Sequence, residues 1–285
     1  MNYRHAYHAG NFGDVLKHAV LASILTYLKR KPQPFRVIDV HAGIGRYDLT
    51  GVEAGKTGEW QGGIGRLIGS DAAPLPDGIE AILAPYLDGV RALNGPGRID
   101  VYPGSPLVAR LLMRPDDRLV VNELHPADRA ALEAELGRDR AVKVMSLDAW
   151  IAVKALLPPP ERRGVVLIDP PYEQPDELAK AITAIDEAMA RFATGIVLLW
   201  YPIKASSEHR AVHQAIGARK SLKALVAEVT VRPDVEARGL NGSGLAVINP
   251  PWTLRTELEA LLPFLAQRLA QRPGGGYSLT ATGGA

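Results

Sequence analysis

The sequence predicts an α/β fold in which a seven-stranded, mostly parallel sheet is covered by helices on both faces. Short apolar runs alternate with longer segments whose apolar residues recur every three to four positions. This alternation is typical of strand–helix–strand units. Several of the apolar runs end in acidic residues or glycines, as strands do at a ligand site. The expected strands are residues 35–40, 118–122, 141–145, 165–169, 196–200, 222–231 and 245–249.

The expected helices precede the first strand and connect most of the others. Apolar residues recur every four positions from Leu16 to Leu28, which predicts an amphipathic helix over residues 14–30, and the prolines that follow it end it. Further helices are expected at residues 126–136, 148–157, 176–192, 206–216 and 253–271. The last two strands flank a glycine-rich turn and are expected to form an antiparallel pair at the sheet edge.

One stretch interrupts the alternation of strands and helices. Residues 48–104 show no clear strand, many glycines and one helical pattern at 79–93. We therefore expect an inserted, mostly helical subdomain within a single domain that covers residues 1–285. Residues 273–285 are rich in glycine and threonine and are expected to form a flexible tail.

The composition excludes several classes of protein. The absence of cysteine rules out disulfides and cysteine-based zinc sites, and it favours an intracellular, cytoplasmic protein. No run of about eighteen apolar residues is present, so no membrane span is expected. The N-terminus is polar and rich in histidine, unlike a secretory signal. A net charge of +2 permits a nucleic-acid partner without requiring one.

The sequence Asp169-Pro170-Pro171-Tyr172 directly follows the apolar run 165–168. A strand that ends in an acidic residue and two prolines predicts a rigid loop. Such a loop suits the methylation of a planar amine, because Asp169 and the Pro170 carbonyl can each accept one N–H hydrogen. Tyr172 can stack on the ring that carries the amine. The prolines donate no N–H and hold the loop that presents these acceptors.

Acidic residues stand at the ends of four expected strands. They are Asp39, Glu123, Asp148 and Asp169. At such an edge Glu123 can accept hydrogen bonds from the hydroxyls of a ribose. Asp148 can accept from an adenine amino group or can cap the helix that follows it, and the sequence leaves both roles open. Four acidic strand ends together indicate a nucleotide-type site more strongly than any one of them does.

The first strand continues into a glycine-containing loop at residues 41–45, which begins with His41. Gly43 and Gly45 allow the backbone to approach a ligand closely. Asp48 occupies the position of the third glycine of a dinucleotide fingerprint, which disfavours a nicotinamide dehydrogenase. Taken alone, this loop fits an ordinary strand-to-helix turn equally well.

Together these features resemble class I S-adenosylmethionine-dependent methyltransferases, and the loop at 169–172 resembles that of adenine-N6 enzymes. Five strings resemble the bacterial RlmJ (YhiR-type) family more closely, from Tyr3 to about Trp252. They are Tyr-Arg-His-Ala-Tyr-His-Ala-Gly-Asn at 3–11, Asp-Val-Leu-Lys-His at 14–18, Tyr-Pro-Gly-Ser-Pro at 102–106, Glu-Leu-His-Pro at 123–126 and Leu-Trp-Tyr-Pro at 199–202. The resemblance implies a Rossmann-like fold and methylation of N6 of one adenine in 23S ribosomal RNA.

The resemblance also implies roles for individual residues. The cofactor S-adenosylmethionine is expected to contact Lys17, His18, His41, Gly43, Ser105, Glu123, Asp148, Ala149 and Asp169. Ala149 stands where the family is expected to have glycine. Asp169, Pro170 and Tyr172 are expected to hold the target amine of an adenine that is unpaired or flipped out of its stack.

The RNA is expected to contact the N-terminal segment, through Tyr3, Arg4 and His5. Basic residues elsewhere are further candidates for phosphate contacts. They are Arg46, Lys56 and Arg66. The protein is expected to act as a monomer without a metal ion.

Three alternatives remain. A DNA adenine-N6 methyltransferase would use the same chemistry on duplex DNA. A non-catalytic RNA-binding protein could retain a relict cofactor pocket, although the complete sequence at 169–172 argues against this. A protein-glutamine methyltransferase is disfavoured, because those enzymes typically place Asn where Asp169 stands.

Two other patterns imitate functional sites. The sequence Asn-Pro-Pro-Trp at 249–252 follows an apolar run, but it comes after the expected edge pair, and we interpret it as structural. His209 and His213 share one helical face, but no third ligand accompanies them. We expect these two histidines to be solvated.

Overall fold

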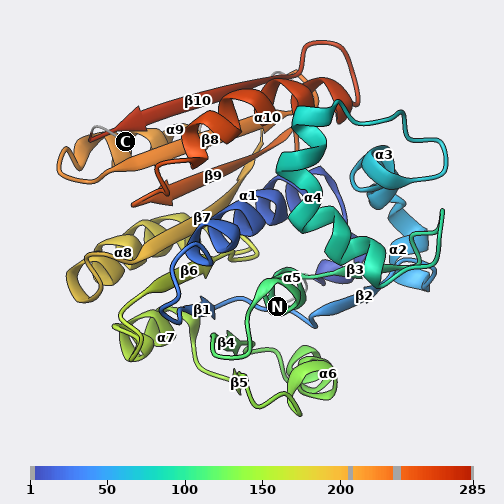
Figure 1. Ribbon diagram of the computed structural model, residues 1–285. Coiled ribbons are helices and arrows are strands. Elements are labelled where there is room, and N and C mark those ends of the chain that lie inside the picture. The colour runs from blue at the N-terminus through green and yellow to red at the C-terminus, as the bar shows by residue number, and fades with distance from the viewer. Residues whose placement is uncertain (1–3, 205–207, 234–238, 284–285) are drawn as a thin grey trace.

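The computed structural model describes residues 4–204, 208–233 and 239–283, and it has a central sheet with helices on both faces (Figure 1). Eight strands form the sheet in the order β10-β8-β9-β7-β6-β1-β4-β5. Strands β5, β4, β1, β6 and β7 are parallel, whereas β9, β8 and β10 each run antiparallel to their neighbours. The predicted Rossmann-like α/β fold is therefore confirmed, with one strand more than the seven expected.

The strands are β1 Arg36–Asp39, β4 Arg118–Asn122, β5 Val142–Met145, β6 Gly164–Ile168, β7 Ile196–Ile203, β8 Ala224–Thr230, β9 Gly242–Ile248 and β10 Gly276–Thr282. The chain moves from β1 to β4 and β5 on one side, and then returns to β6 on the other side of β1. This reversal creates a crevice at the carboxyl ends of the parallel strands, where open α/β sheets bind their ligands.

Two hydrophobic cores lie on opposite faces of the sheet. Successive residues of a strand point to opposite faces, so Val37 belongs to one core and its neighbour Ile38 to the other. The first core includes residues of α1 (Phe12–Leu28), α4 (Asp77–Ala92), α5 (Ser105–Leu112), α6 (Pro126–Leu136) and α10 (Leu254–Arg268). The second includes residues of α7 (Ala149–Leu156), α8 (Glu177–Arg191) and α9 (Glu208–Ala218). Within the described part of the chain, no helix is both long enough and apolar enough to cross a membrane.

Helix α1 is buried on almost all sides, so the predicted amphipathic character is wrong. Every residue from Phe12 to Ala22 is buried, including the charged Asp14 and Lys17. The helix packs on the sheet with one face, and α4, α5 and α10 cover much of the remainder. The helix also begins two residues earlier than expected, because the Asn11 side chain accepts from the N–H groups of Gly13 and Asp14 and caps it.

The segment 48–104 contains the helices α2 (Val52–Thr57), η2 (Glu59–Gly62), α3 (Gly65–Ile68) and α4. It also contains a strand that the sequence pattern did not reveal, β3 (Val101–Pro103), which pairs antiparallel with β2 (Arg46–Asp48). Both strands are only three residues long, too short for a visible alternation. Figure 1 shows α4 beside α1, and α2 and α3 on the same side of the molecule as this small sheet.

The C-terminal segment was expected to be a flexible tail. Instead, its residues Gly276–Thr282 form the strand β10. It pairs with β8 in antiparallel register, and the Ser278 hydroxyl donates to the Glu228 carboxylate at 2.8 Å. Its side chains are half-buried or exposed, because only one face of this edge strand meets the core. Glycine and threonine occur in such an edge strand, but a segment rich in both did not predict a strand from its composition.

Removal of residues 273–285 would leave the backbone groups of β8 unpaired at the sheet edge. We expect the melting temperature to fall by about 5 °C, equivalent to about 2 kcal/mol. Cofactor affinity is expected to stay unchanged, because β10 lies far along the sheet from β1 and β4. Calorimetry on the truncated and full-length proteins checks this, with Ser278→Ala as a control that removes one side-chain hydrogen bond only.

Candidate active site

The carboxyl ends of four parallel strands open into one cavity of about 510 Å³. Its lining includes each residue that the sequence predicted for cofactor binding. They are Lys17, His18, His41, Gly43, Ser105, Glu123, Asp148, Ala149 and Asp169. Pro170 and Tyr172 line the same cavity. The fold therefore brings together residues from β1, β4, β5, β6, α1 and α5 that are far apart in the sequence.

Glu123 joins the loop after β4 to the loop after β1. Its carboxylate accepts from the Gly43 N–H at 2.9 Å and from the His125 N–H at 2.8 Å. Burial raises the pKa of the Glu123 carboxyl. Gly43 has a φ of 63°, and a Cβ there would lie 2.3 Å from the Tyr47 hydroxyl, so only glycine fits. The carboxylate and this close backbone form a cradle suited to the ribose of a nucleotide-type cofactor.

Substitution Glu123→Gln would place an amide N–H₂ against a backbone N–H and remove the charge. We expect the dissociation constant for S-adenosylhomocysteine to rise about tenfold, because a hydrogen bond to a charged acceptor is lost. Isothermal titration calorimetry measures this change. Glu133→Gln on the exposed face of α6 is the matched control. An unchanged dissociation constant for the Glu123 variant would contradict its placement beside the cofactor.

Asp39, expected to face a ligand, instead supports the protein around the cavity. Its Oδ2 accepts from the Ser105 hydroxyl at 2.6 Å, and its Oδ1 accepts from the His41 N–H at 3.2 Å. Burial raises the pKa of the Asp39 carboxyl to about 6. Ser105 is the first residue of α5, so this bond fixes the N-terminus of that helix beside the cavity.

Asp148 takes one of the two roles that the sequence left open, that of a helix cap. Its Oδ1 accepts from the N–H groups of Trp150 and Ile151, at 3.0 and 3.2 Å, and so caps α7. The residue also lines the cavity. Trp150, which the sequence analysis missed, lines the cavity as well and meets the His41 ring edge-on, with 5.5 Å between ring centroids. A tryptophan at this strand end adds an aromatic surface for a planar group.

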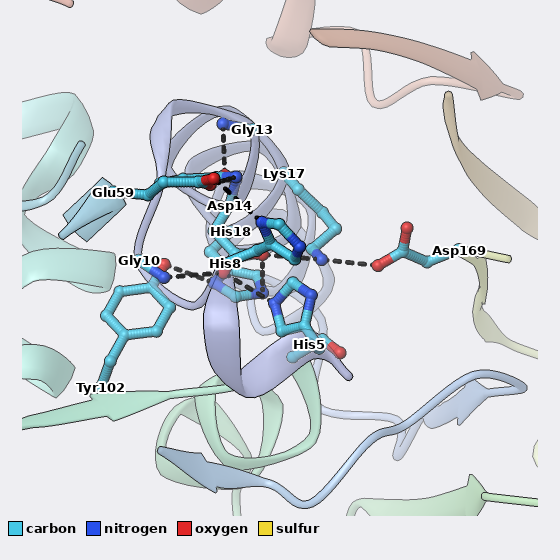
Figure 2. A network of polar contacts seen from close by, with 12 residues as sticks. His5, His8, Gly10, Gly13, Asp14, Lys17, His18, Glu59, Tyr102 and Asp169 are labelled. Carbon is cyan, nitrogen blue, oxygen red and sulfur yellow. Dashed lines mark hydrogen bonds and ion pairs between the residues drawn. The ribbon is translucent and has the colours of Figure 1, made fainter. Parts of the chain in front are cut away.

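Lys17 holds Asp169 at the edge of the cavity. The Lys17 ammonium lies 2.5 Å from Asp169 Oδ2 and 2.9 Å from Asp14 Oδ1 (Figure 2). Burial by itself lowers the pKa of Lys17, but the two carboxylates raise it well above its ordinary value. Burial by itself raises the pKa of Asp14, but the neighbouring His5 and Lys17 hold it well below its ordinary value. Lys17 therefore stays charged and orients both carboxylates.

The loop after β6 is fixed at both of its ends. The Asp169 N–H donates to His41 Nδ1 at 3.3 Å, and the Tyr172 hydroxyl donates to the Trp200 carbonyl at 2.6 Å. Tyr172 has a φ of 54°, which a bulky residue adopts only where the surroundings impose it. The Tyr172 and Trp200 rings lie 5.8 Å apart and both border the cavity. An aromatic wall therefore stands beside the Asp169 carboxylate.

His18 presents a polar atom without a partner. The residue is completely buried, and its Nδ1 lies 2.7 Å from the Tyr102 hydroxyl. Its Nε2 is also buried, and among the described residues it has no hydrogen-bond partner. An unpaired buried polar atom is costly, so this atom is a candidate contact for a bound group. His18 belongs to the cavity lining.

Of the predicted RNA-contacting residues that the structure describes, one lines the cavity and one does not. Tyr3 lies outside the described residues. Arg4 is exposed, lies 3.5 Å from Asp128, and does not belong to the cavity lining. His5, in the short helix η1 (His5–Tyr7), does line the cavity, and its Nε2 lies 2.9 Å from Asp14 Oδ2. His5 is thus connected through Asp14 and Lys17 to Asp169.

The three other basic candidates differ in their surroundings. Arg46 forms a 3.1 Å ion pair with Glu135, and Lys56 lies over the Tyr7 ring. Arg66 donates to the carbonyls of residues 268 and 270, so it fastens the end of α10. Its role is structural in this arrangement, because its guanidinium is turned toward backbone acceptors within the protein.

Both patterns that imitated functional sites have structural explanations. The Asn249 side chain donates to the carbonyls of residues 193 and 195 at 2.9 Å, and it does not line the cavity. His213, expected to be solvated, is partly buried and its Nε2 lies 2.9 Å from the Glu228 carboxylate. The carboxylate stands on β8, so only the fold could show this contact.

Asp14 is the functional residue that sequence reasoning missed most clearly. It is buried, and it contacts His5, Gly10 and Lys17. Its spacing of three residues from Lys17 and four from His18 is a local signal, because such pairs meet on one helix face. The contacts expected between the cofactor and Lys17 and His18 left Asp14 without a role, so a buried ion pair within this helix was not predicted.

The profile of the family described as "Ribosomal RNA large subunit methyltransferase D, RlmJ" matches residues 32–281. The chain belongs to this family. A Haemophilus influenzae relative named "Ribosomal RNA large subunit methyltransferase J" is 43% identical over 280 residues, which cover 98% of each chain. An Escherichia coli relative with the same name is 44% identical over 272 residues, which cover 94% of each chain.

A solved structure shows that the fold is shared as well. The crystal structure of a Legionella pneumophila protein has 32% sequence identity and a TM-score of 0.83, and the match covers 96% of this chain and 98% of that one. The membership of the RlmJ family that the sequence motifs implied is thus confirmed, and so is the Rossmann-like class I methyltransferase fold.

The residues of the cavity fit S-adenosylmethionine. Glu123 and Gly43 offer a carboxylate and a close backbone for the ribose, and Asp148 with Trp150 offers an acceptor and an aromatic ring for the adenine. The unpaired Nε2 of His18 suits a polar group of the methionine part. The cavity therefore provides one polar feature for each part of this cofactor.

Proposed function

We propose that this protein transfers a methyl group from S-adenosylmethionine to the exocyclic N6 of one adenine in 23S ribosomal RNA. The observation that carries the proposal is the position of Asp169. Its carboxylate stands at the edge of a nucleotide-sized cavity, beside the Pro170 carbonyl and an aromatic wall. Membership of a family of ribosomal RNA methyltransferases supports RNA as the substrate.

S-adenosylmethionine supplies an activated methyl group on a sulfonium, so the protein mainly has to position the acceptor. Asp169 would accept one N6 hydrogen and the Pro170 carbonyl the other. The adenine ring would stack on Tyr172. As N6 gains positive charge, the Asp169 carboxylate stabilises it and then accepts its proton. The ion pair with Lys17 orients the Asp169 carboxylate before the adenine arrives.

The target adenine has to be unpaired or flipped out. In a base-paired stem, N6 donates to the partner base and lies within the stack, out of reach of a recessed carboxylate. We infer that Tyr3, Arg4 and His5 contact the RNA, because His5 borders the cavity and Arg4 is exposed next to it. We further infer that the protein acts as a monomer in the cytoplasm, where ribosomal RNA resides, because one chain supplies the whole cavity lining.

The test uses 23S ribosomal RNA from cells that lack the gene. The RNA is incubated with the protein and S-adenosylmethionine, digested, and assayed for N6-methyladenosine by mass spectrometry. We expect one new modified adenine, and none with the Asp169→Ala variant. Duplex DNA is run in parallel: modification of DNA without modification of RNA would replace the proposal with the DNA adenine alternative.

A further inference from the structure

A chain of three buried side chains connects the inserted segment to the cavity. His18 Nδ1 lies 2.7 Å from the Tyr102 hydroxyl, which in turn lies 2.8 Å from the Tyr86 hydroxyl. His18 belongs to α1, Tyr102 to β3 and Tyr86 to α4. Each is at most 1% exposed. Figure 2 shows His18 and Tyr102 from close by, next to the pair formed by Asp14 and Lys17.

The protons of this chain can be arranged with the bonds running toward His18 or away from it; a third arrangement, in which Nδ1–H and Tyr86 both donate to Tyr102, leaves the Tyr102 proton and the Nε2 lone pair unsatisfied. In the first, Tyr86 donates to Tyr102, and Tyr102 donates to His18 Nδ1, so the imidazole proton resides on Nε2. In the second, every bond is reversed: Nδ1–H donates to Tyr102, and Tyr102 donates to Tyr86. The Tyr86 hydroxyl proton then has no acceptor, since among the described residues Tyr86 forms no other hydrogen bond.

The first arrangement leaves fewer unsatisfied groups. It leaves one, the His18 Nε2–H, on a residue that belongs to the cavity lining. The second leaves two, namely the buried Tyr86 proton and the Nε2 lone pair. Each buried unsatisfied group is unfavourable, so the first arrangement is favoured. The Asp14 carboxylate oxygen, 3.9 Å from Nε2, favours a proton at this atom as well.

His18 is neutral in this environment. Burial lowers its pKa to about 3, with the charge of Lys17 acting in the same direction. The groups that face it from other elements are Tyr86, Tyr102 and the cation of His5 when that residue is protonated. A neutral imidazole with its proton on Nε2 is a directed donor, and it requires an acceptor in the cavity.

The position of the donor indicates which acceptor it meets. Asp148 and Glu123 stand at β5 and β4, where adenine and ribose fit, and Asp169 stands at β6, where the methyl group has to be. The methionine part is left between α1 and the N-terminus of α5, which also favours an anion. We propose that Tyr86 and Tyr102 are positioning residues that hold His18 in its Nε2–H tautomer, so that it donates a hydrogen bond to the cofactor carboxylate.

This proposal rests on the proposed function, because it assumes that S-adenosylmethionine occupies the cavity. Two ligands separate the carboxylate from the rest of the cofactor. S-adenosylhomocysteine carries the carboxylate, and 5′-methylthioadenosine lacks the whole amino acid group. The proteins compared are the wild type, Tyr102→Phe, Tyr86→Phe and Tyr27→Phe, of which the last removes a hydroxyl from α1 outside the cavity lining.

Calorimetry is expected to show about tenfold weaker binding of S-adenosylhomocysteine to Tyr102→Phe, since a hydrogen bond to a charged group is weakened. For Tyr86→Phe we expect about threefold weaker binding of S-adenosylhomocysteine. Tyr102 can still donate to His18 Nδ1, but it no longer accepts the hydrogen bond from Tyr86 that orients its hydroxyl. Binding of 5′-methylthioadenosine should change less than about twofold in both variants. The Tyr27→Phe control should bind both ligands as the wild type does.

Nitrogen-15 NMR of the wild-type histidines tests the tautomer without any variant. We expect the His18 ring to show a protonated Nε2 and an unprotonated Nδ1. A protonated Nδ1 overturns the proposal. An equal loss of affinity of the Tyr102→Phe variant for both ligands also overturns it, because that result would indicate general damage to the cavity. So does an unchanged affinity of this variant for both ligands. A wild-type protein that fails to bind S-adenosylhomocysteine would instead contradict the cofactor assignment itself.

Discussion

Substitution Asp169→Asn is expected to lower the rate of methyl transfer about 10³-fold, within the range of losses seen when a positioned acid–base group is removed. The amide keeps the size of the carboxylate but not its charge, so it no longer stabilises the developing charge on N6. Affinity for S-adenosylhomocysteine should change less than about threefold, because Asp14 still pairs with the Lys17 ammonium. Single-turnover assays on 23S ribosomal RNA measure the rate, and calorimetry measures the affinity.

Asp176→Asn is the matched control for this experiment. Asp176 is an exposed carboxylate seven positions further along the chain, and its partner is Lys180 on the surface. We expect this variant to methylate RNA at the wild-type rate. Activity of the Asp169 variant within tenfold of the wild type would mean that another group accepts the N6 proton, and our mechanism would then be wrong.

Substitution Lys17→Met is expected to destabilise the fold by about 3–5 kcal/mol and to abolish methyl transfer. The substitution leaves the carboxylates of Asp14 and Asp169 close together without their cation, and an unpaired buried charge is costly. Urea unfolding followed by circular dichroism measures the free energy. Lys56→Met, in which an exposed lysine is replaced, should change it by less than about 0.5 kcal/mol.

A double variant distinguishes loss of the charge pair from loss of packing. Lys17→Met combined with Asp14→Asn removes both a cation and a carboxylate, and it should recover much of the lost stability while activity stays low. If the double variant is no more stable than Lys17→Met alone, packing of the lysine side chain and not its charge would explain the effect. The two residues are in direct contact, so their effects are expected to be non-additive.

The ion pair also predicts how stability depends on pH. The pKa of Asp14 lies well below its ordinary value in the folded protein, so the unfolded chain binds the proton more tightly. The stabilisation is therefore present above pH ~4 and is lost as the pH falls toward the folded pKa. Acid titration of the wild type and Asp14→Asn should show a shallower loss of stability for the variant in this range.

Most of the fold could be predicted because its signals are local. The strands from β4 to β7 and the helices α6 to α8 show their apolar periodicity within a few residues, and tertiary contacts do not override it. The segment 48–104 and β10 were harder to predict. Strands of three residues, such as β2 and β3, are too short to show a period, and β10 is defined by its partner β8 and not by its composition.

In the candidate site, too, residues with a local sequence signal could be predicted, and residues placed by tertiary contacts could not. Motifs and strand ends located His41, Glu123, Asp148 and Asp169, because a parallel sheet places the ends of its strands at one edge. The partners of these residues could not be located in this way. Trp150 belongs to an ordinary apolar segment, and Trp200 to a family string that carried no assigned role, so neither residue was predicted to border a cavity.

By itself, therefore, the sequence determined the α/β architecture and the order of its main strands and helices, and it predicted the chemistry of the loop at 169–172. These features depend on residues that are neighbours in the sequence, because hydrophobic periodicity is visible within a few positions. Only the tertiary structure decided that Lys17 meets Asp169, 152 positions away, and that Tyr86 and Tyr102 support His18 from the inserted segment. Such contacts arise when distant elements pack together and exclude water, since a buried charge or hydroxyl then has to find its partner in space and not in sequence.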